Sequence, residues 1–102
     1  MAEPKRDEQP IEQEIRLEKA RTLGKAGEAL ERACAAAWEA YRAQTPGDRE
    51  AARAYVLMHQ EARERRRNLL LQREAMGFFD HRDLDRCYPL PPPPDRTAAR
   101  GG

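Results

Sequence analysis

The chain contains no serine, only two cysteines and two histidines, and aromatic residues make up just 6% of it. The absence of serine excludes a serine nucleophile, and Thr22, Thr45 and Thr97 have no histidine in a plausible local arrangement to act as their base. His59 and His81 stand alone, without the H-E-x-x-H or Glu-x-x-His spacing of a metal site. We therefore expect a protein that is not an enzyme and has no catalytic, metal or cofactor site.

A long apolar run is also missing. No stretch approaches the ~20 apolar residues that a bilayer helix needs, and the charged residues 1–8 lack the apolar core of a signal peptide. The 19 basic and 18 acidic residues nearly cancel, so the net charge of +1 favours neither nucleic acid nor an anionic membrane. Cys34 and Cys87 lie far apart and make no metal pattern, which is typical of reduced thiols. We expect a cytoplasmic protein that binds no membrane.

What the chain does contain, between residues 11 and 76, is a high density of Ala, Leu, Glu, Arg and Gln, all strong helix formers. The first helix is predicted to open at Gln9-Pro10, because proline is tolerated in a first turn, and to run to about Arg42. Its apolar stripe falls on positions 20, 23, 27, 30, 34, 37 and 41, spaced by threes and fours. Gly24 and Gly27 each cost about 1 kcal/mol against alanine in a helix interior. Either a neighbouring group passes close to them or the helix kinks there.

The strongest break in this region is the segment 44–48. Thr45 is predicted to cap the second helix, with Pro46 at its first position and Asp48 as the capping-box partner. This helix is predicted to end at about Met76, before a left-handed cap at Gly77. Its apolar stripe again has helical spacing and comprises Ala51, Tyr55, Met58, Ala62, Leu69 and Met76.

Beyond the second helix, Phe78 and Phe79 are predicted to fold back over the hairpin end as an apolar plug. Asp80 can cap one short turn over residues 81–86, with Asp83 as its partner, and the prolines 91–94 favour polyproline II. The predicted fold is all-α: two long antiparallel helices (a helical hairpin), a short C-terminal helical turn and a proline-rich tail. The expected organisation is a flexible arm over 1–9, a hairpin domain over 10–88 and a proline-rich, flexible tail over 89–102.

Two helices of ~30 residues would span ~45 Å each and leave part of their apolar stripe uncovered. A second copy would complete a four-helix bundle, so we expect a homodimer; the alternative is a monomer closed by the segment 78–90. The residues expected in this interaction seam are Leu23, Gly27, Leu30, Cys34, Tyr41, Tyr55, Met58 and Leu69. Further candidate partner-binding residues are Phe78, Phe79, Tyr88 and Leu90.

Two charged or proline-rich segments have competing interpretations. The candidate phosphate-binding residues are Arg63, Arg65, Arg66 and Arg67. The alternative is a solvated helix face, because Glu61, Glu64 and Glu74 stand at ion-pairing spacings. The segment Arg86 to Pro92 fits the basic-x-x-Pro-x-x-Pro pattern bound by aromatic-lined grooves, or else it forms a stiff strap over Phe78, Phe79 and the helices.

The blocks Ile11-Glu12-Gln13-Glu14-Ile15, Leu23-Gly24-Lys25-Ala26-Gly27 and Gln72-Arg73-Glu74-Ala75-Met76-Gly77 resemble a family of short bacterial helical proteins of unknown function. The resemblance covers residues 11–91 and departs in the arginine-rich middle of the second helix and in the four-proline run. It implies a bacterial helical fold and supplies no activity, cofactor or catalytic residue. It also directs attention to residues 72–74, which are either a polar cluster for a partner or a clasp onto the first helix near Gly24 and Gly27.

Together these patterns favour a non-enzymatic protein–protein interaction or self-assembly module, whose partner is a second copy or another helical protein. The alternative function is that of a nucleic-acid-associated accessory protein, which would use the basic helix face from Arg63 to Arg73.

Overall fold

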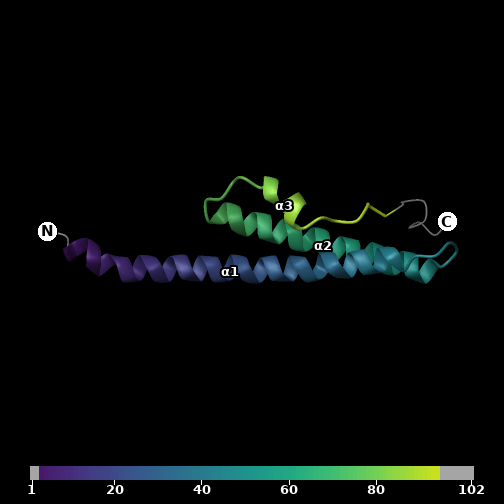
Figure 1. Ribbon diagram of the computed structural model, residues 1–102, viewed down its shortest axis with the longest axis horizontal. Coiled ribbons are helices and arrows are strands. Elements are labelled where there is room, and N and C mark those ends of the chain that lie inside the picture. The colour runs from purple at the N-terminus through teal and green to yellow at the C-terminus, as the bar shows by residue number, and fades with distance from the viewer. Residues whose placement is uncertain (1–2, 95–102) are drawn as a thin grey trace.

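The described part of the chain is an all-α helical hairpin with a short third helix, as predicted. A computed structural model describes the backbone of residues 3–94 and the side chains of residues 11–94. It contains α1 (Glu3–Arg42), α2 (Arg49–Ala75) and α3 (Arg82–Cys87), and no strand occurs in these residues. Helices α1 and α2 run antiparallel and side by side, with α3 against α2 on the side away from α1 (Figure 1). The molecule is long and thin, with extents of 73 × 19 × 19 Å.

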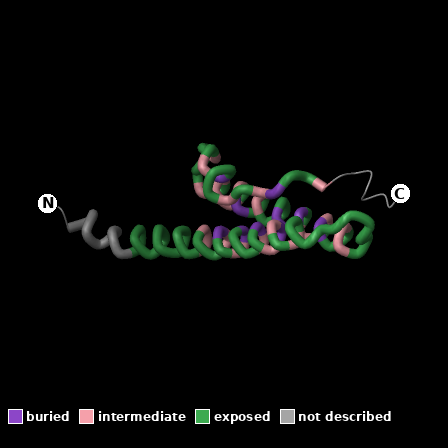
Figure 2. The backbone as a smooth tube through the Cα atoms, turned by 45° about the vertical axis from the view of Figure 1, so that its right-hand side comes forward, coloured by how far each residue is buried: buried purple, intermediate pink, exposed green. Residues whose placement is uncertain are grey.

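Helix α1 is much longer than its partner. It has 40 residues against 27 in α2, which at 1.5 Å per residue leaves about 20 Å of α1 beyond the end of α2. The helix begins at Glu3 and not at Pro10, so the residues 3–9 that we assigned to an arm are helical. Residues 11–21, which we call the overhang, are all exposed, as Figure 2 shows.

The bend between α1 and α2 lies where predicted, but its cap residue differs. Thr45 and Asp48 close a turn in which the amide N of Asp48 donates to the carbonyl O of Thr45 at 3.1 Å, and Gly47 has a φ of +84°. Pro46-Gly47 at the centre is the signature of a type II turn. The N-cap is therefore Asp48, not Thr45: its carboxylate accepts a 3.0 Å hydrogen bond from the amide N of Ala51.

The other end of α2 confirms the predicted left-handed cap at Gly77. Gly77 has a φ of +92°, and its amide N donates to the carbonyl O of Glu74 at 3.0 Å. The amide N of Phe78 donates to the carbonyl O of Arg73 at 2.8 Å. These two bonds form a Schellman motif. The apolar plug predicted next to it is wrong, because the side chains of Phe78 and Phe79 are 54% and 71% exposed.

Leu84 of α3, 0% exposed, fills the place over the hairpin that we gave to the phenylalanines. It joins a small core shared by the three helices, together with Leu30, Cys34, Ala37, Ala62 and Leu69. Of the predicted seam, Leu30, Cys34, Tyr55 and Leu69 are buried side chains, Gly27 is buried, Leu23 and Met58 are partly buried, and Tyr41 is exposed. None of the helices, as far as residues 3–94 describe them, is both long enough and apolar enough to cross a membrane.

Candidate functional site

The segment Tyr88–Pro92, which we call the strap, lies across the hairpin and is fixed by side chains from both long helices. The indole Nε1 of Trp38 in α1 donates to the carbonyl O of Pro89 at 2.8 Å. In α2, the hydroxyl of Tyr55 donates to the carbonyl O of Pro92. Nε2 of His59, also in α2, lies 3.2 Å from the carbonyl O of Pro91. A carbonyl oxygen only accepts, so Nε2 of His59 carries the hydrogen. Three ring donors thus bind three main-chain carbonyls.

The donors belong to a continuous set of rings near the bend, which we call the aromatic row: Trp38, Tyr41, Tyr55 and His59. The ring centroids are 5.8 Å apart from Trp38 to Tyr41, 5.4 Å from Tyr41 to Tyr55 and 5.7 Å from Tyr55 to His59. Tyr55 and His59 share one face of α2 because they are four residues apart. Burial, and to a smaller extent Tyr41, raises the pKa of the Tyr55 phenol, so this hydroxyl stays protonated and able to donate.

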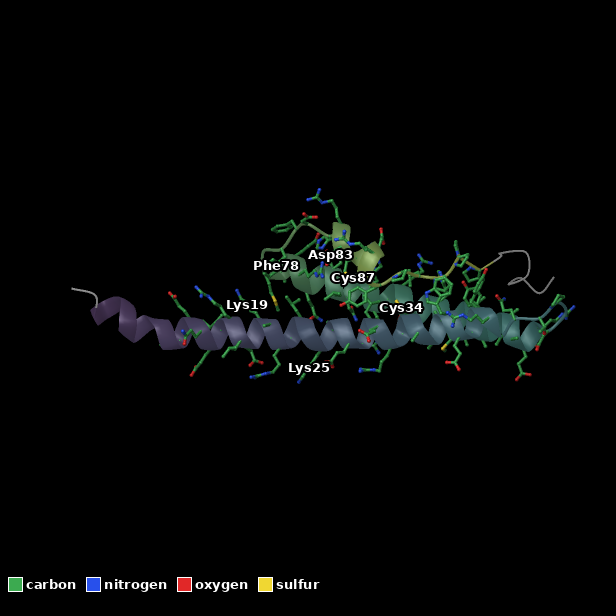
Figure 3. All side chains as sticks on the ribbon, in the orientation of Figure 1. Lys19, Lys25, Cys34, Phe78, Asp83 and Cys87 are labelled. Atoms are coloured by element: carbon green, nitrogen blue, oxygen red, sulfur yellow. The ribbon has the colours of Figure 1, made fainter. Side chains whose placement is uncertain are left out.

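At the other end of the strap, Tyr88 explains one of the two interior glycines. A Cβ atom on Gly27 would lie 2.9 Å from the hydroxyl O of Tyr88, which confirms that a neighbouring group passes close to this position. Gly24 has no such neighbour within 4 Å. The Sγ of Cys34 lies 4.0 Å from the carbonyl O of Tyr88, and burial raises the pKa of this thiol. Figure 3 shows Cys34 on α1 and Cys87 on α3, and both are free thiols.

The prediction of a stiff strap is therefore confirmed, but its position is corrected. It lies on the aromatic row and Gly27, not on Phe78 and Phe79. Pro91 is buried, and the carbonyls of Pro89, Pro91 and Pro92 already have partners. A basic-x-x-Pro-x-x-Pro ligand for another protein would have to leave this position first.

The polar residues before Gly77 form a clasp, as predicted, but with α3 and not with α1. Two hydrogen bonds of 2.9 Å join the guanidinium nitrogens Nη1 and Nη2 of Arg73 to Oδ1 and Oδ2 of Asp83. These bonds lower the pKa of the Asp83 carboxyl. Beside them, Nε2 of His81 lies 3.3 Å from Oε2 of Glu74. Within the described residues, Oε1 of Gln72 and Nδ1 of His81 are buried without a hydrogen-bond partner.

The predicted phosphate-binding arginines divide into two groups. Nε of Arg65 binds Oε1 of Glu61 at 2.8 Å, and Nη2 of Arg66 binds Oδ1 of Asp85 at 2.9 Å. Arg63 and Arg67 make no ion pair with the residues that the structure describes, and they line a surface groove of about 830 Å³ next to the strap. The other walls of the groove include His59, Leu70, Asp85, Leu90 and Pro94.

Exposed large apolar side chains occur on both long helices, including Tyr41 and Leu57, and two groups of them stand at the end of the hairpin away from the bend. Ile11, Ile15 and Leu17 stand on the overhang, with 62%, 50% and 61% of their surface exposed. Phe78 and Phe79 follow α2, and Figure 3 places Phe78 in the loop between α2 and α3. The predicted partner-binding residues thus separate: Phe78 and Phe79 are exposed, whereas Tyr88 and Leu90 pack against the core.

No family model, no curated protein and no solved structure matches this chain. The resemblance to short bacterial helical proteins therefore stays a prediction.

Proposed function

We propose that the chain is a non-enzymatic, cytoplasmic helical module that associates with a second copy of itself. The overhang is the observation that carries this proposal. Helix α1 extends about 20 Å beyond α2, yet in its overhang half or more of the side chains of Ile11 and Ile15 is exposed. Full burial of one such side chain is worth about 1.5–3 kcal/mol, which favours a partner there.

The face of α1 that continues from these isoleucines supports a helical partner. At about 100° per residue, Trp38 and Gly27, which contact the strap, lie on one flank of the seam. The opposite flank carries a line of partly exposed alanines at helical spacing: Ala26, Ala29, Ala33, Ala36 and Ala40. Ile11 and Ile15 fall on the same line. Alanines let another helix approach closely, so α1 of a second copy, running antiparallel, fits along this flank.

Sedimentation equilibrium of the full chain tests the proposal. We expect a dimer at tens to hundreds of micromolar, and we expect Ile11→Glu combined with Ile15→Glu to give a monomer with unchanged helical circular dichroism. Leu17→Glu is the matched control, because Leu17 is equally exposed but lies on another face of α1. A wild-type monomer at every concentration would contradict the proposal, and so would a control that dissociates as readily as the double variant.

The groove at Arg63 and Arg67 favours a second candidate, a nucleic-acid-associated role. Both guanidinium groups are without an ion pair among the described residues, and phosphate contacts use such groups. Retention on DNA or RNA at low salt, lost in Arg63→Ala/Arg67→Ala and kept in Arg65→Ala, would support it. No retention at low salt would remove it.

A further inference from the structure

The hydrogen bonds between the aromatic row and the strap all go to the main chain of the strap. A polyproline II segment has no internal hydrogen bonds, so its carbonyls accept from whatever donors surround it. Here those donors are Nε1 of Trp38, the hydroxyl of Tyr55 and Nε2 of His59. Each acceptor is a main-chain carbonyl oxygen, a group that every peptide segment has. The same three carbonyls on any proline-rich segment would meet the same donors.

The aromatic row also has the chemistry of sites that bind such segments. Aromatic-lined grooves recognise polyproline II because the ligand is already extended and loses little entropy, while ring N–H and O–H groups fix its carbonyls. We propose that the aromatic row is a binding site for proline-rich segments, and that the strap occupies this site in cis. A proline-rich segment of another protein, or the strap of a second copy, takes its place when the strap lifts.

Exchange at the aromatic row requires residues 89–92 to lift. Of these, Pro91 is buried and Leu90 is partly buried against the core, whereas Pro89 and Pro92 are exposed, so two of the four side chains leave the core; Tyr88, at the other end of the strap, also packs against it. The open groove at Arg63 and Arg67 is also lined by Leu90 and Pro94, by Glu64, and by the ion pair of Arg66 with Asp85. An incoming segment with carboxylates next to its prolines would therefore find more cations than carboxylates beside the aromatic row.

A strap-weakened variant of the full chain makes the site accessible without altering it. Pro91→Gly combined with Pro92→Gly removes the rigid extended backbone and the buried ring of the strap but leaves all donors in place. The probe is a fluorescent peptide with the sequence of residues 88–94, Tyr-Pro-Leu-Pro-Pro-Pro-Pro, which contains the strap, and the same peptide with alanine for each proline is the control. Pro92→Gly alone is the milder variant, because the Pro92 side chain is exposed and its loss opens no cavity.

We expect the peptide to bind the strap-weakened variant at least about tenfold more tightly than wild type, because the strap no longer competes for the site. Adding Trp38→Phe keeps a ring but removes one donor, and should weaken peptide binding by about fivefold to tenfold. The indole N–H resonance of Trp38, the only tryptophan, should shift in the strap-weakened variant and return toward its wild-type position with peptide.

Several outcomes would overturn the proposal. The first is that the strap-weakened variant is folded but binds no peptide at millimolar concentration. The second is that the alanine control peptide binds as tightly as the proline peptide. The third is that Trp38→Phe leaves the affinity for the peptide unchanged. The two ligand sources separate by mass. If the protein is a dimer that dissociates with excess peptide but not in the Ile11→Glu/Ile15→Glu variant, exchanged straps hold it together. If it is a monomer that binds one peptide, the site serves another protein. Self-association through the overhang can fail without affecting these results.

Discussion

The contact between Gly27 and Tyr88 gives a quantitative test of where the strap lies. Gly24 and Gly27 both stand inside α1, and replacement of either by alanine gains about 1 kcal/mol of helix propensity. At Gly24 the added methyl group meets nothing within 4 Å, so Gly24→Ala should raise the free energy of unfolding by about 1 kcal/mol.

Gly27→Ala should behave differently, because its methyl carbon would lie 2.9 Å from the hydroxyl O of Tyr88. The tyrosine ring has to move, and overpacking of this kind typically costs about 1–3 kcal/mol. The helix gain offsets part of this cost, so we expect Gly27→Ala to change stability by between zero and a loss of about 2 kcal/mol. In a Tyr88→Phe background the nearest ring atom is Cζ, at 3.8 Å, which is an ordinary contact. There Gly27→Ala should recover the full gain of about 1 kcal/mol.

Urea unfolding followed by circular dichroism measures all four corners of this double-mutant cycle. A coupling of about 1–3 kcal/mol between residues 27 and 88 is the expected result. If Gly27→Ala stabilises the wild-type chain as much as Gly24→Ala does, Tyr88 does not lie on α1, and the position we give to the strap is wrong.

Three further outcomes are expected. Leu30→Ala, at a fully buried site, should lower the free energy of unfolding by about 2.7–5 kcal/mol in urea titrations; a loss below about 1 kcal/mol would mean that Leu30 lies outside the core. Because Arg73 lowers the pKa of the Asp83 carboxyl, this pair stabilises the fold above about pH 4, and its contribution disappears as the pH falls further. The difference in free energy of unfolding between wild type and Asp83→Asn should therefore shrink in acid. A difference that does not change with pH would contradict the pairing. Cys87 should react with an aromatic disulfide reagent at pH 8 much faster than Cys34, which is buried and has a raised pKa; equal rates would place Cys34 in solvent.

Local patterns in the sequence predict most of the fold. The threes-and-fours spacing around Leu30 and Leu69 identifies the faces that meet, and the Pro-Gly and Met-Gly pairs mark the ends of the long helices. The cap of α2 is Asp48 and not the predicted Thr45, and residue type alone does not separate them, because both suit that role. Pro46-Gly47 decides between them: it forms its own turn, so the helix can begin only after it.

The candidate site is harder to predict, because it depends on contacts between distant residues. The strap binds donors at positions 38, 55 and 59, and no spacing in the chain indicates that their side chains would converge. Its place four residues after Tyr55 puts His59 on the same face of the helix, but this spacing alone does not identify the carbonyl that its ring binds. Likewise, the charge of Arg73 predicts a carboxylate partner, but only the path of the chain after Gly77 selects Asp83 of α3 over a residue of α1.

Hydrogen exchange at the indole N–H of Trp38 tests most directly whether residues 88–92 close the hairpin on the aromatic row. With one tryptophan in the chain, the signal needs no assignment. The 2.8 Å bond to the carbonyl of Pro89 predicts that this hydrogen exchanges at least about tenfold more slowly than a free indole, and that Pro91→Gly with Pro92→Gly removes the protection. If the indole hydrogen of Trp38 exchanges in the wild-type protein as fast as that of a free indole, residues 88–92 do not lie on the aromatic row.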